Sequence, residues 1–231
     1  MKLLVVAADR MECRGILARA QRQCPAAVRA DWARLVRLGG HEILLVANGV
    51  GAKRAAAAVD AAIESFRPDA IVSTGFCGAL APELAVGDVV VGTAIAGADR
   101  NYPGRPVASR LAHHSGTVCS IDHVARSAEE KRRLGGGGAI AVEMEAAGVA
   151  ARAQALGLPF YCVRSVTDLA GETMVNDFNS ALRSDGHFDT MVILTRILQQ
   201  PSRRLPELFR LRKRCRRAAH TLGEFFADCR L

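Results

Sequence analysis

The chain has 231 residues, half of them apolar and 5% aromatic, and carries a formal net charge of +8. This length is sufficient for one domain with a substantial core, and no apolar run approaches the roughly 20 residues that a membrane-spanning helix requires. The seven scattered cysteines contain no CxxC pair, which argues against a zinc site or a disulfide framework and favours a reducing cytoplasm.

The N-terminal apolar run, residues 2–8, is short and is interrupted by Asp9 and Arg10, so we expect a first β-strand rather than a signal peptide. Apolar residues at helical spacing predict helices over 52–66 and 141–156. Strands that alternate with helices favour an α/β sheet with crossover connections, which we assign to residues 1–201. The further strands are predicted at 43–47, 69–74, 87–92, 117–120 and 160–166.

Two segments are predicted to be loops. Residues 97–116 are polar and rich in Arg, Pro, Gly and His, and we expect a long loop at a pocket rim or at an oligomer contact. Gly135–Gly138 is a run of four glycines, which predicts a flexible surface loop.

A break at Gln199–Ser202 precedes the C-terminal segment, residues 202–231, which is predicted to be a basic amphipathic helix. Residues 203–217 hold eight Arg or Lys against one Glu, and Arg210, Arg214 and Arg217 form a basic flank. Two placements fit this pattern: docking on the body or on a partner subunit with solvated arginines, and contact with an anionic membrane. Nucleic acid is not expected, because no recognised motif accompanies the charge. The apolar stripe consists of residues 208, 211, 215, 218, 222, 225 and 229.

The run Ala141-Val142-Glu143-Met144-Glu145-Ala146-Ala147 places two acids among small apolar residues. Burying a carboxylate is unfavourable unless a partner offsets it. If this run opens a helix over a pocket, the two acids point to different faces and one reaches a ligand hydroxyl. Acids are also common at the start of a helix, where its dipole favours them, so the run alone leaves both interpretations open.

Two further blocks make the pattern specific. Phe160–Asp168 is predicted to be a buried strand that ends in Asp168, with Arg164 on the same face, and Ser73–Pro82 is a glycine-containing block. With the Glu-Met-Glu run, these blocks resemble the nucleoside phosphorylase and nucleosidase superfamily, in the branch of methylthioadenosine/S-adenosylhomocysteine nucleosidase and purine nucleoside phosphorylase. The resemblance covers Met1 to about Pro201 and implies a single three-layer α/β/α domain with a central mixed β-sheet.

The resemblance implies an acid that protonates the leaving base and an acid that activates water. Asp168 matches the aspartate at the purine N7 and 6-substituent; partial burial would raise its pKa and suit a general acid. Glu12 matches the glutamate that activates water, and Asp9 is a second candidate. Arg164 is expected to orient a carboxylate or to form a structural ion pair.

The resemblance also implies how the ribose is held. Glu145 matches the glutamate that binds the ribose hydroxyls, since a carboxylate accepts two hydrogen bonds from a diol. Met144 matches the residue that packs against the ribose, and Glu143 is a further substrate-binding candidate.

The walls of the implied pocket are less specific. Phe76 stands where the family has a small hydroxyl residue beside the nucleophile. Val124 and Ala125 align with the region whose backbone reads adenine, and Phe178 matches an apolar wall near the 5′ side of the substrate. His123 is expected at the rim or on the surface.

The nucleophile separates hydrolysis from phosphorolysis. Related phosphorylases bind phosphate with an arginine near the first strand and another at the start of the glycine block. Ser73 and Thr74 stand at the second position here, and only Arg10 lies near the first. Water is therefore the predicted nucleophile, and no metal or organic cofactor is expected.

The segments Gly157–Arg164, Val166–Glu172 and Asp185–Asp189 are most similar to hopanoid-associated members of the family. We predict a cytoplasmic, homo-oligomeric nucleosidase that releases adenine from a 5′-substituted adenine nucleoside, either adenosylhopane-like or methylthioadenosine/S-adenosylhomocysteine. A basic helix at a membrane surface would suit a lipid-linked substrate. The alternatives are a purine nucleoside phosphorylase and a non-catalytic nucleoside-binding protein.

Overall fold

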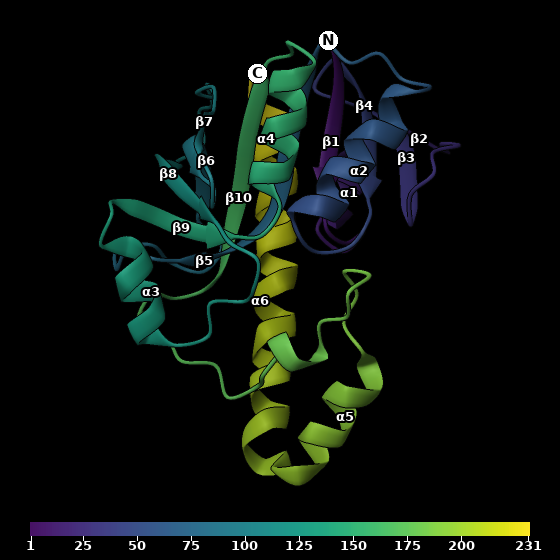
Figure 1. Ribbon diagram of the computed structural model, residues 1–231. Coiled ribbons are helices and arrows are strands. Elements are labelled where there is room, and N and C mark those ends of the chain that lie inside the picture. Colours follow the sequence, from purple (N-terminus) through teal and green to yellow (C-terminus); the bar gives the residue numbers. More distant parts are fainter.

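The structure is a computed structural model that describes residues 1–231 (Figure 1). Its strands are β1 (Lys2–Ala7), β2 (Arg22–Pro25), β3 (Trp32–Leu38), β4 (His41–Ala47), β5 (Ala70–Ala79), β6 (Val89–Ala96), β7 (Asn101–Pro103), β8 (His114–Ser120), β9 (Ala139–Glu143) and β10 (Phe160–Asp168). Its helices are α1 (Arg14–Arg19), α2 (Ala52–Ile63), α3 (Ala128–Gly135), α4 (Ala146–Ala155), the 3₁₀ turn η1 (Asn179–Ala181), α5 (Thr190–Gln199) and α6 (Pro201–Asp228).

All strands belong to one mixed sheet in the order β10-β6-β8-β9-β5-β1-β4-β3-β2, with β7 paired to β6. Because β10 also pairs with β5, the strands β5, β9, β8, β6 and β10 close on themselves. Strand β1 is parallel to β4 and β5, and β10 is parallel to β5. Parallel strands end at the same edge of a sheet, so the segments that follow β1, β5 and β10 meet there.

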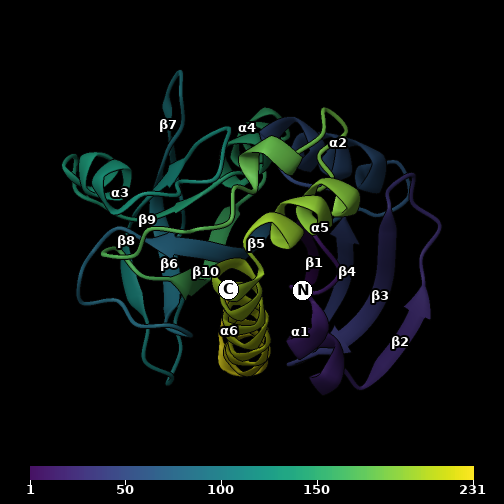
Figure 2. The ribbon, with the colours of Figure 1, turned by 90° about the horizontal axis from the view of Figure 1, so that it is seen from below.

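Helices cover both faces of the sheet (Figure 2), as predicted for three layers. The alternation of side chains along β1 shows this directly. Leu4 and Val6 pack with α2 and α4 in one apolar cluster, whereas Leu3 and Val5 pack with α1 and the end of α6 in the other.

The C-terminal segment forms one helix, α6, and its last three turns are part of the core. Leu222, Phe225 and Phe226 are buried in the same cluster as β1 and β4. Gly15 of α1 and Gly223 of α6 let the two helices touch, since a Cβ on Gly15 would lie 1.7 Å from the carbonyl oxygen of Ala219. None of the helices is long and apolar enough to span a membrane.

Two sequence predictions need correction. The helix expected over 141–156 begins only at Ala146, because Ala141 and Val142 are in strand β9 and pair with β5 and β8. A short, fully buried apolar run has the same composition in a strand and in a helix, which explains the error. The long loop expected over 97–116 contains β7 and the first residues of β8.

Strands β2 and β3 were not predicted; they form the outer edge of the sheet and carry arginines among their apolar residues. The glycine run lies at the end of α3, where Gly135 is the last helical residue and the rest forms a hydrogen-bonded turn.

Candidate active site

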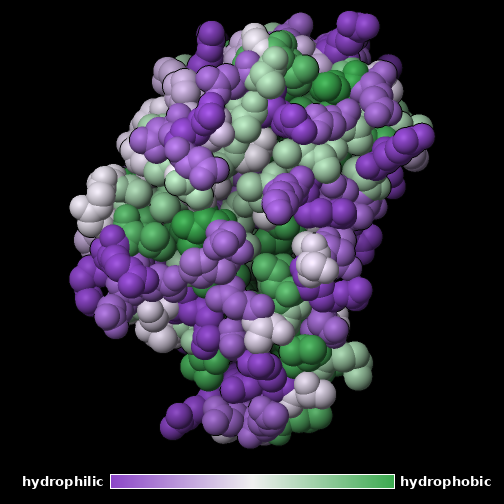
Figure 3. Space-filling view, viewed as in Figure 1, coloured by the Kyte–Doolittle hydropathy of each residue, from purple (hydrophilic) through white to green (hydrophobic).

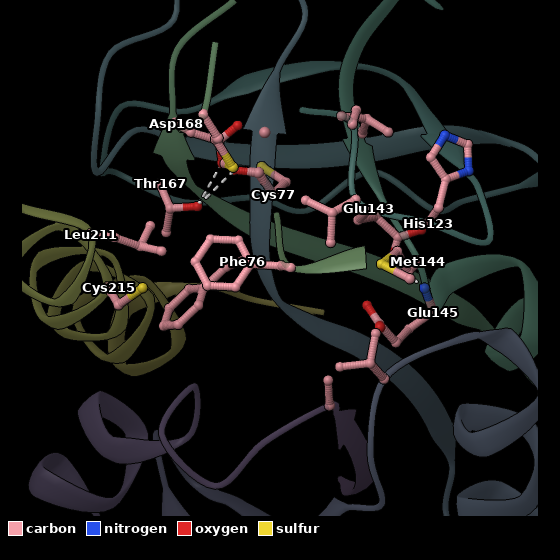
Figure 4. Close-up of a pocket in the computed structure, with 18 of the residues that line it drawn as sticks. Phe76, Cys77, His123, Glu143, Met144, Glu145, Thr167, Asp168, Leu211 and Cys215 are labelled. Atoms are coloured by element: carbon pink, nitrogen blue, oxygen red, sulfur yellow. Dashed lines mark hydrogen bonds between the residues drawn. The ribbon is translucent and has the colours of Figure 1, made fainter. Parts of the chain in front are cut away.

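The carboxyl ends of β1, β5, β9 and β10 surround a cavity of about 290 Å³. Helix α6 and the segment before it close the other side, with Leu211 and Cys215 across the cavity from Met144 and Glu145 (Figure 4). Most of the lining is apolar, and no Lys or Arg lines it. The lining residues named by the sequence are Glu12, Phe76, His123, Val124, Ala125, Glu143, Met144, Glu145, Asp168 and Phe178. Asp9 and Arg10 are exposed and lie outside the lining.

Asp168 ends β10 and is 7% exposed. Burial raises the pKa of its carboxyl, and the ammonium group of Lys131 opposes that effect. Thr167 Oγ1 donates a hydrogen bond of 3.0 Å to Oδ1. The group is therefore placed and desolvated as a proton donor needs to be.

Glu12 follows β1 in a tight turn and is buried. Its Oε2 accepts the N–H groups of Ala8 (2.8 Å) and Asp9 (3.2 Å), and its Oε1 accepts the N–H of Phe76 (2.8 Å). Burial raises the pKa of Glu12, while the charge of Arg164 and these backbone donors lower it. The three donors fix the carboxylate in one orientation at the cavity wall.

Arg164 is fully buried behind the cavity and does not line it. Its guanidinium forms a short ion pair with Glu143 and donates to Ser73 Oγ at 2.6 Å and to the carbonyl of Thr74 at 2.7 Å. It does not pair with Asp168, although both residues are on β10. Arg164 therefore forms an ion pair with Glu143 and lies near Glu145, and it does not orient Asp168.

Glu143 is tied to the start of α4. Its carboxylate accepts the N–H groups of Glu145 (2.9 Å) and Ala146 (2.8 Å) in addition to the Arg164 pair. Only a small part of it reaches the cavity, since its side chain is 1% exposed. These contacts hold α4 in place and leave Glu145 to face the cavity.

Glu145 is the N-cap residue of α4. Its Oε1 accepts the N–H of Gly51 at 2.9 Å, and its Oε2 lies 3.8 Å from Nη1 of Arg164. Burial, together with the neighbouring charge of Glu143, raises the pKa of Glu145 to about 8. A carboxyl group that keeps its proton to higher pH can both donate and accept hydrogen bonds.

Val124 and Ala125 line the cavity side by side, and their backbone groups differ in hydrogen bonding. The N–H and C=O of Val124 are both bonded to the side chain of Asn179, at 2.7 and 2.9 Å. The N–H and C=O of Ala125 have no partner within the chain. Phe178 packs edge-to-face on Phe188 at 6.0 Å and forms an apolar wall.

Several residues in or behind the cavity wall were not predicted. Thr167 and Lys131 contact Asp168, and Leu211 and Cys215 come from the C-terminal helix. Lys131 stands in a charged run, Glu129–Arg133, whose sequence is typical of a solvated helix face, so no local signal separates it from its neighbours. Leu211 and Cys215 belong to the predicted apolar stripe, but the stripe alone did not indicate that these two residues line a cavity.

The basic flank of α6 is not all solvated. Arg214 makes two hydrogen bonds, of 2.6 and 2.8 Å, to the carboxylate of Glu172, and it holds the pKa of that carboxyl at about 2. Glu172 also accepts the N–H of Leu169, the residue after Asp168. This contact ties α6 to the end of β10.

The chain is similar to known proteins in sequence and in fold. The family model described as Phosphorylase superfamily matches residues 2–113 and 105–185. A 5'-methylthioadenosine/S-adenosylhomocysteine nucleosidase of Bacillus pumilus is 31% identical over 193 residues, which cover 68% of this chain and 81% of the relative. The corresponding protein of Tolumonas auensis is 27% identical over 192 residues, covering 70% and 84%.

Solved structures share the fold over nearly the whole chain, including α6. The 5'-methylthioadenosine/S-adenosylhomocysteine nucleosidase of S. pneumoniae, solved with a transition-state inhibitor, superposes with a TM-score of 0.72 at 21% identity and covers 99% of both chains. A futalosine hydrolase of Helicobacter pylori gives a TM-score of 0.69 at 18% identity, covering 97% and 98%. The chain belongs to the phosphorylase superfamily, in the branch of the 5'-methylthioadenosine/S-adenosylhomocysteine nucleosidases.

Proposed function

We propose that the chain is a nucleosidase that hydrolyses the N-glycosidic bond of a 5′-substituted adenine nucleoside and releases adenine. The observation that carries this proposal is that Glu12, Glu145 and Asp168, far apart in sequence, line one cavity. Cleavage of this bond requires a proton for the leaving base, a hold on the ribosyl group and an activated nucleophile. Each requirement has one carboxyl group.

Asp168 is assigned to the base. A protonated carboxyl donates to the N7 acceptor of a purine, and its other oxygen accepts from the amino group of adenine. The free N–H and C=O of Ala125 offer a second donor and acceptor in the same cavity. Proton transfer to N7 lets the glycosidic electron pair leave with a neutral base.

Glu145 is assigned to the ribose hydroxyls and Glu12 to the nucleophile. The cavity suits water better than phosphate as the nucleophile, because a phosphate dianion needs positive charge or an array of N–H donors. No Lys or Arg lines the cavity, and Arg164 is occupied by Glu143, Ser73 and Thr74.

The 5′ substituent is proposed to be apolar. Leu211 and Cys215 lie across the cavity from Glu145. Neither side chain carries a charge that could pair with the polar tail of S-adenosylhomocysteine. A large extension, as in adenosylhopane, would have to continue past Phe188, Ile193 and Leu211, because a purine and a ribose already occupy much of 290 Å³.

A substrate panel tests these assignments. Free base would be quantified by chromatography from adenosine, inosine, methylthioadenosine, S-adenosylhomocysteine and adenosylhopane. We expect adenine release with the highest kcat/KM on a substrate with an apolar 5′ group, and little release from inosine, which lacks the amino group. Equal turnover of all five nucleosides, or no release of base from any, would contradict the proposal.

We further propose that α5 and the first turns of α6 contact an anionic membrane at its cytoplasmic face. This hairpin projects from the end of the molecule away from the sheet, and apolar residues show there among charged ones (Figures 1 and 3). Leu198 is 77% exposed and Phe209 60% exposed. The nearby arginines suit an anionic lipid surface.

Vesicle sedimentation tests this contact. We expect the protein to sediment with anionic vesicles but not with zwitterionic ones, and Leu198→Glu to weaken the binding. Sedimentation equilibrium of both forms would show whether the expected homo-oligomer exists. If Leu198→Glu dissociates an oligomer and the wild type ignores anionic vesicles, the face binds a second copy and the membrane proposal is wrong.

A further inference from the structure

Lys131 is a charged residue without access to solvent. It lies on α3, and its side chain is fully buried, whereas the next residues, Arg132 and Arg133, are exposed. Its ammonium donates to Oδ2 of Asp168 at 2.5 Å and to the carbonyl of Leu169 at 2.9 Å. It does not line the cavity, so it contacts the Asp168 carboxyl without being able to touch a ligand there.

Stability alone does not account for this lysine. Removing an ammonium group from water costs several kcal/mol, and replacing a buried ion pair by apolar side chains is often neutral or stabilising. The only carboxylate in contact with Lys131 is that of Asp168. We therefore expect Lys131 to act on the carboxyl group of Asp168.

The contact makes the two oxygens of Asp168 different. An ammonium group only donates hydrogen bonds, so Oδ2 acts as an acceptor, and a proton on the neutral acid is favoured on Oδ1, which has no contact with Lys131. Oδ1 lies 3.0 Å from the hydroxyl of Thr167, which lies 3.3 Å from the carbonyl oxygen of Cys77 (Figure 4). In the neutral acid, Asp168 can donate to Thr167 while Thr167 donates to Cys77; in the carboxylate, Thr167 donates to Oδ1.

We propose that Lys131 is a positioning residue for Asp168, which it holds with Oδ1 as the proton-bearing oxygen and whose carboxylate it stabilises once the proton has left. The inference rests on the proposed function of Asp168 as the general acid. In that step the Oδ1–H bond breaks, an N–H bond forms on the base, and the C–N electron pair goes to the base. The carboxylate that remains is then paired with an ammonium already in place, so no reorganisation is required.

Replacing Lys131 by Met, which has a similar length and no charge, tests the proposal, and Lys131→Arg is the charge-conserving variant. We expect Lys131→Met to lower kcat by ~10- to 100-fold with a small change in KM, because only the proton-transfer step is affected. The high-pH limb of the kcat profile should move upward by about one unit or more, since an opposite charge at this distance lowers a carboxyl pKa by ~1–3 units. Lys131→Arg should recover part of both effects.

Arg132→Met, one residue away and exposed, is the matched control and should leave the kcat profile unchanged. A purely structural lysine would lower the unfolding temperature on replacement but leave the pH limb in place. An unshifted limb in folded Lys131→Met would overturn the proposal.

A measurement on the wild-type protein separates this inference from the proposed function, and a variant is needed only to assign one signal. The ¹³Cγ signal of Asp168, assigned by its loss in Asp168→Asn, and the ¹³Cε signal of Lys131 would be followed against pH. We expect both to change at one midpoint. If the two signals change at independent midpoints, the role of Lys131 is wrong even if adenine is released. If they share a midpoint but no base is released, only the proposed function is wrong.

Discussion

A Cβ atom on residue 75 would lie 2.5 Å from Oε1 of Glu12, so Gly75 leaves the space that the Glu12 carboxylate occupies. The same atom would lie 2.7 Å from Nη1 of Arg164. Gly75 also has a φ of +142°, which residues with side chains rarely adopt. One glycine thus allows both the Glu12 carboxylate, which is proposed to activate water, and the buried guanidinium of Arg164 to approach β5.

Gly75→Ala is therefore expected to displace Glu12 and Arg164 and to lower kcat by at least ~100-fold, the lower end of what a general base contributes. Gly137→Ala is the control, since a Cβ there meets no atom within 4 Å. The measurement is the rate of adenine release, with circular dichroism to establish folding. A fully active Gly75→Ala enzyme would show that the placement of Glu12 does not matter.

Asp168→Asn is expected to lower kcat by ~10²- to 10⁴-fold, because the amide has no acidic proton to give. It also leaves the ammonium of Lys131 buried without a carboxylate, which costs ~3–5 kcal/mol of stability. Lys131→Met in the same chain should restore much of that stability but none of the activity. Urea unfolding of the single and double variants gives the first result and adenine release the second; a stable, active Asp168→Asn protein would contradict both.

The raised pKa of Glu145 links its proton to folding. Its pKa is about 8 in the folded chain, from an ordinary value of 4.5, so between these values the folded state holds a proton that the unfolded state has lost. The free energy of unfolding then falls as the pH rises through this window, by up to ~1.4 kcal/mol per pH unit for this group. Glu12 and Asp168, whose pKa values burial also raises, act in the same direction.

Glu145→Gln removes this proton while keeping the shape of the side chain. We expect the variant to gain stability relative to the wild type as the pH rises from 5 to 8, and to lose activity at both values. Urea unfolding at pH 5 and pH 8 measures the difference. A stability difference that is the same at the two pH values would mean that Glu145 is ionised in the folded chain.

Leu211 tests whether α6 faces the 5′ substituent. Leu211→Ala is expected to lower kcat/KM about tenfold for a nucleoside with an apolar 5′ group, which corresponds to ~1.4 kcal/mol of lost apolar contact. Adenosine, which lacks that group, should be affected much less. Leu208→Ala is the control, because Leu208 is on the same helix and does not line the cavity. If Leu211→Ala leaves the ratio of kcat/KM between the two substrates unchanged, Leu211 does not contact the 5′ group.

The parts of the fold that rest on periodicity were predictable from the sequence. All six predicted strands are present, because buried β-strands such as Phe160–Asp168 are continuous apolar runs. The boundary between β9 and α4 was missed, since Ala141 and Val142 fit either element until their partners in β5 and β8 are known. The edge strands β2 and β3 were missed for a different reason, since exposed positions leave a weak apolar pattern.

The carboxyl groups of the candidate site were named from a resemblance in the sequence around them, but their partners were not. Pairing is a long-range property: Arg164 meets Glu143 rather than Asp168, and the partner of Asp168 is Lys131, 37 residues earlier. No local pattern marks that lysine, because a charged helical turn has the same composition whether it is exposed or folded inward. Only the folded structure shows which charge is buried.

The proposed hydrolysis uses three carboxyl groups, one each for the base, the ribose and the attacking water, in a cavity that no Lys or Arg lines. The most direct measurement is the identity of the sugar product when the enzyme turns over an adenine nucleoside in the presence of saturating phosphate. Mass spectrometry and ³¹P NMR distinguish a free sugar from a sugar 1-phosphate. We expect adenine and the free 5′-substituted ribose, formed at the same rate without phosphate. A sugar 1-phosphate whose formation depends on phosphate would contradict the account.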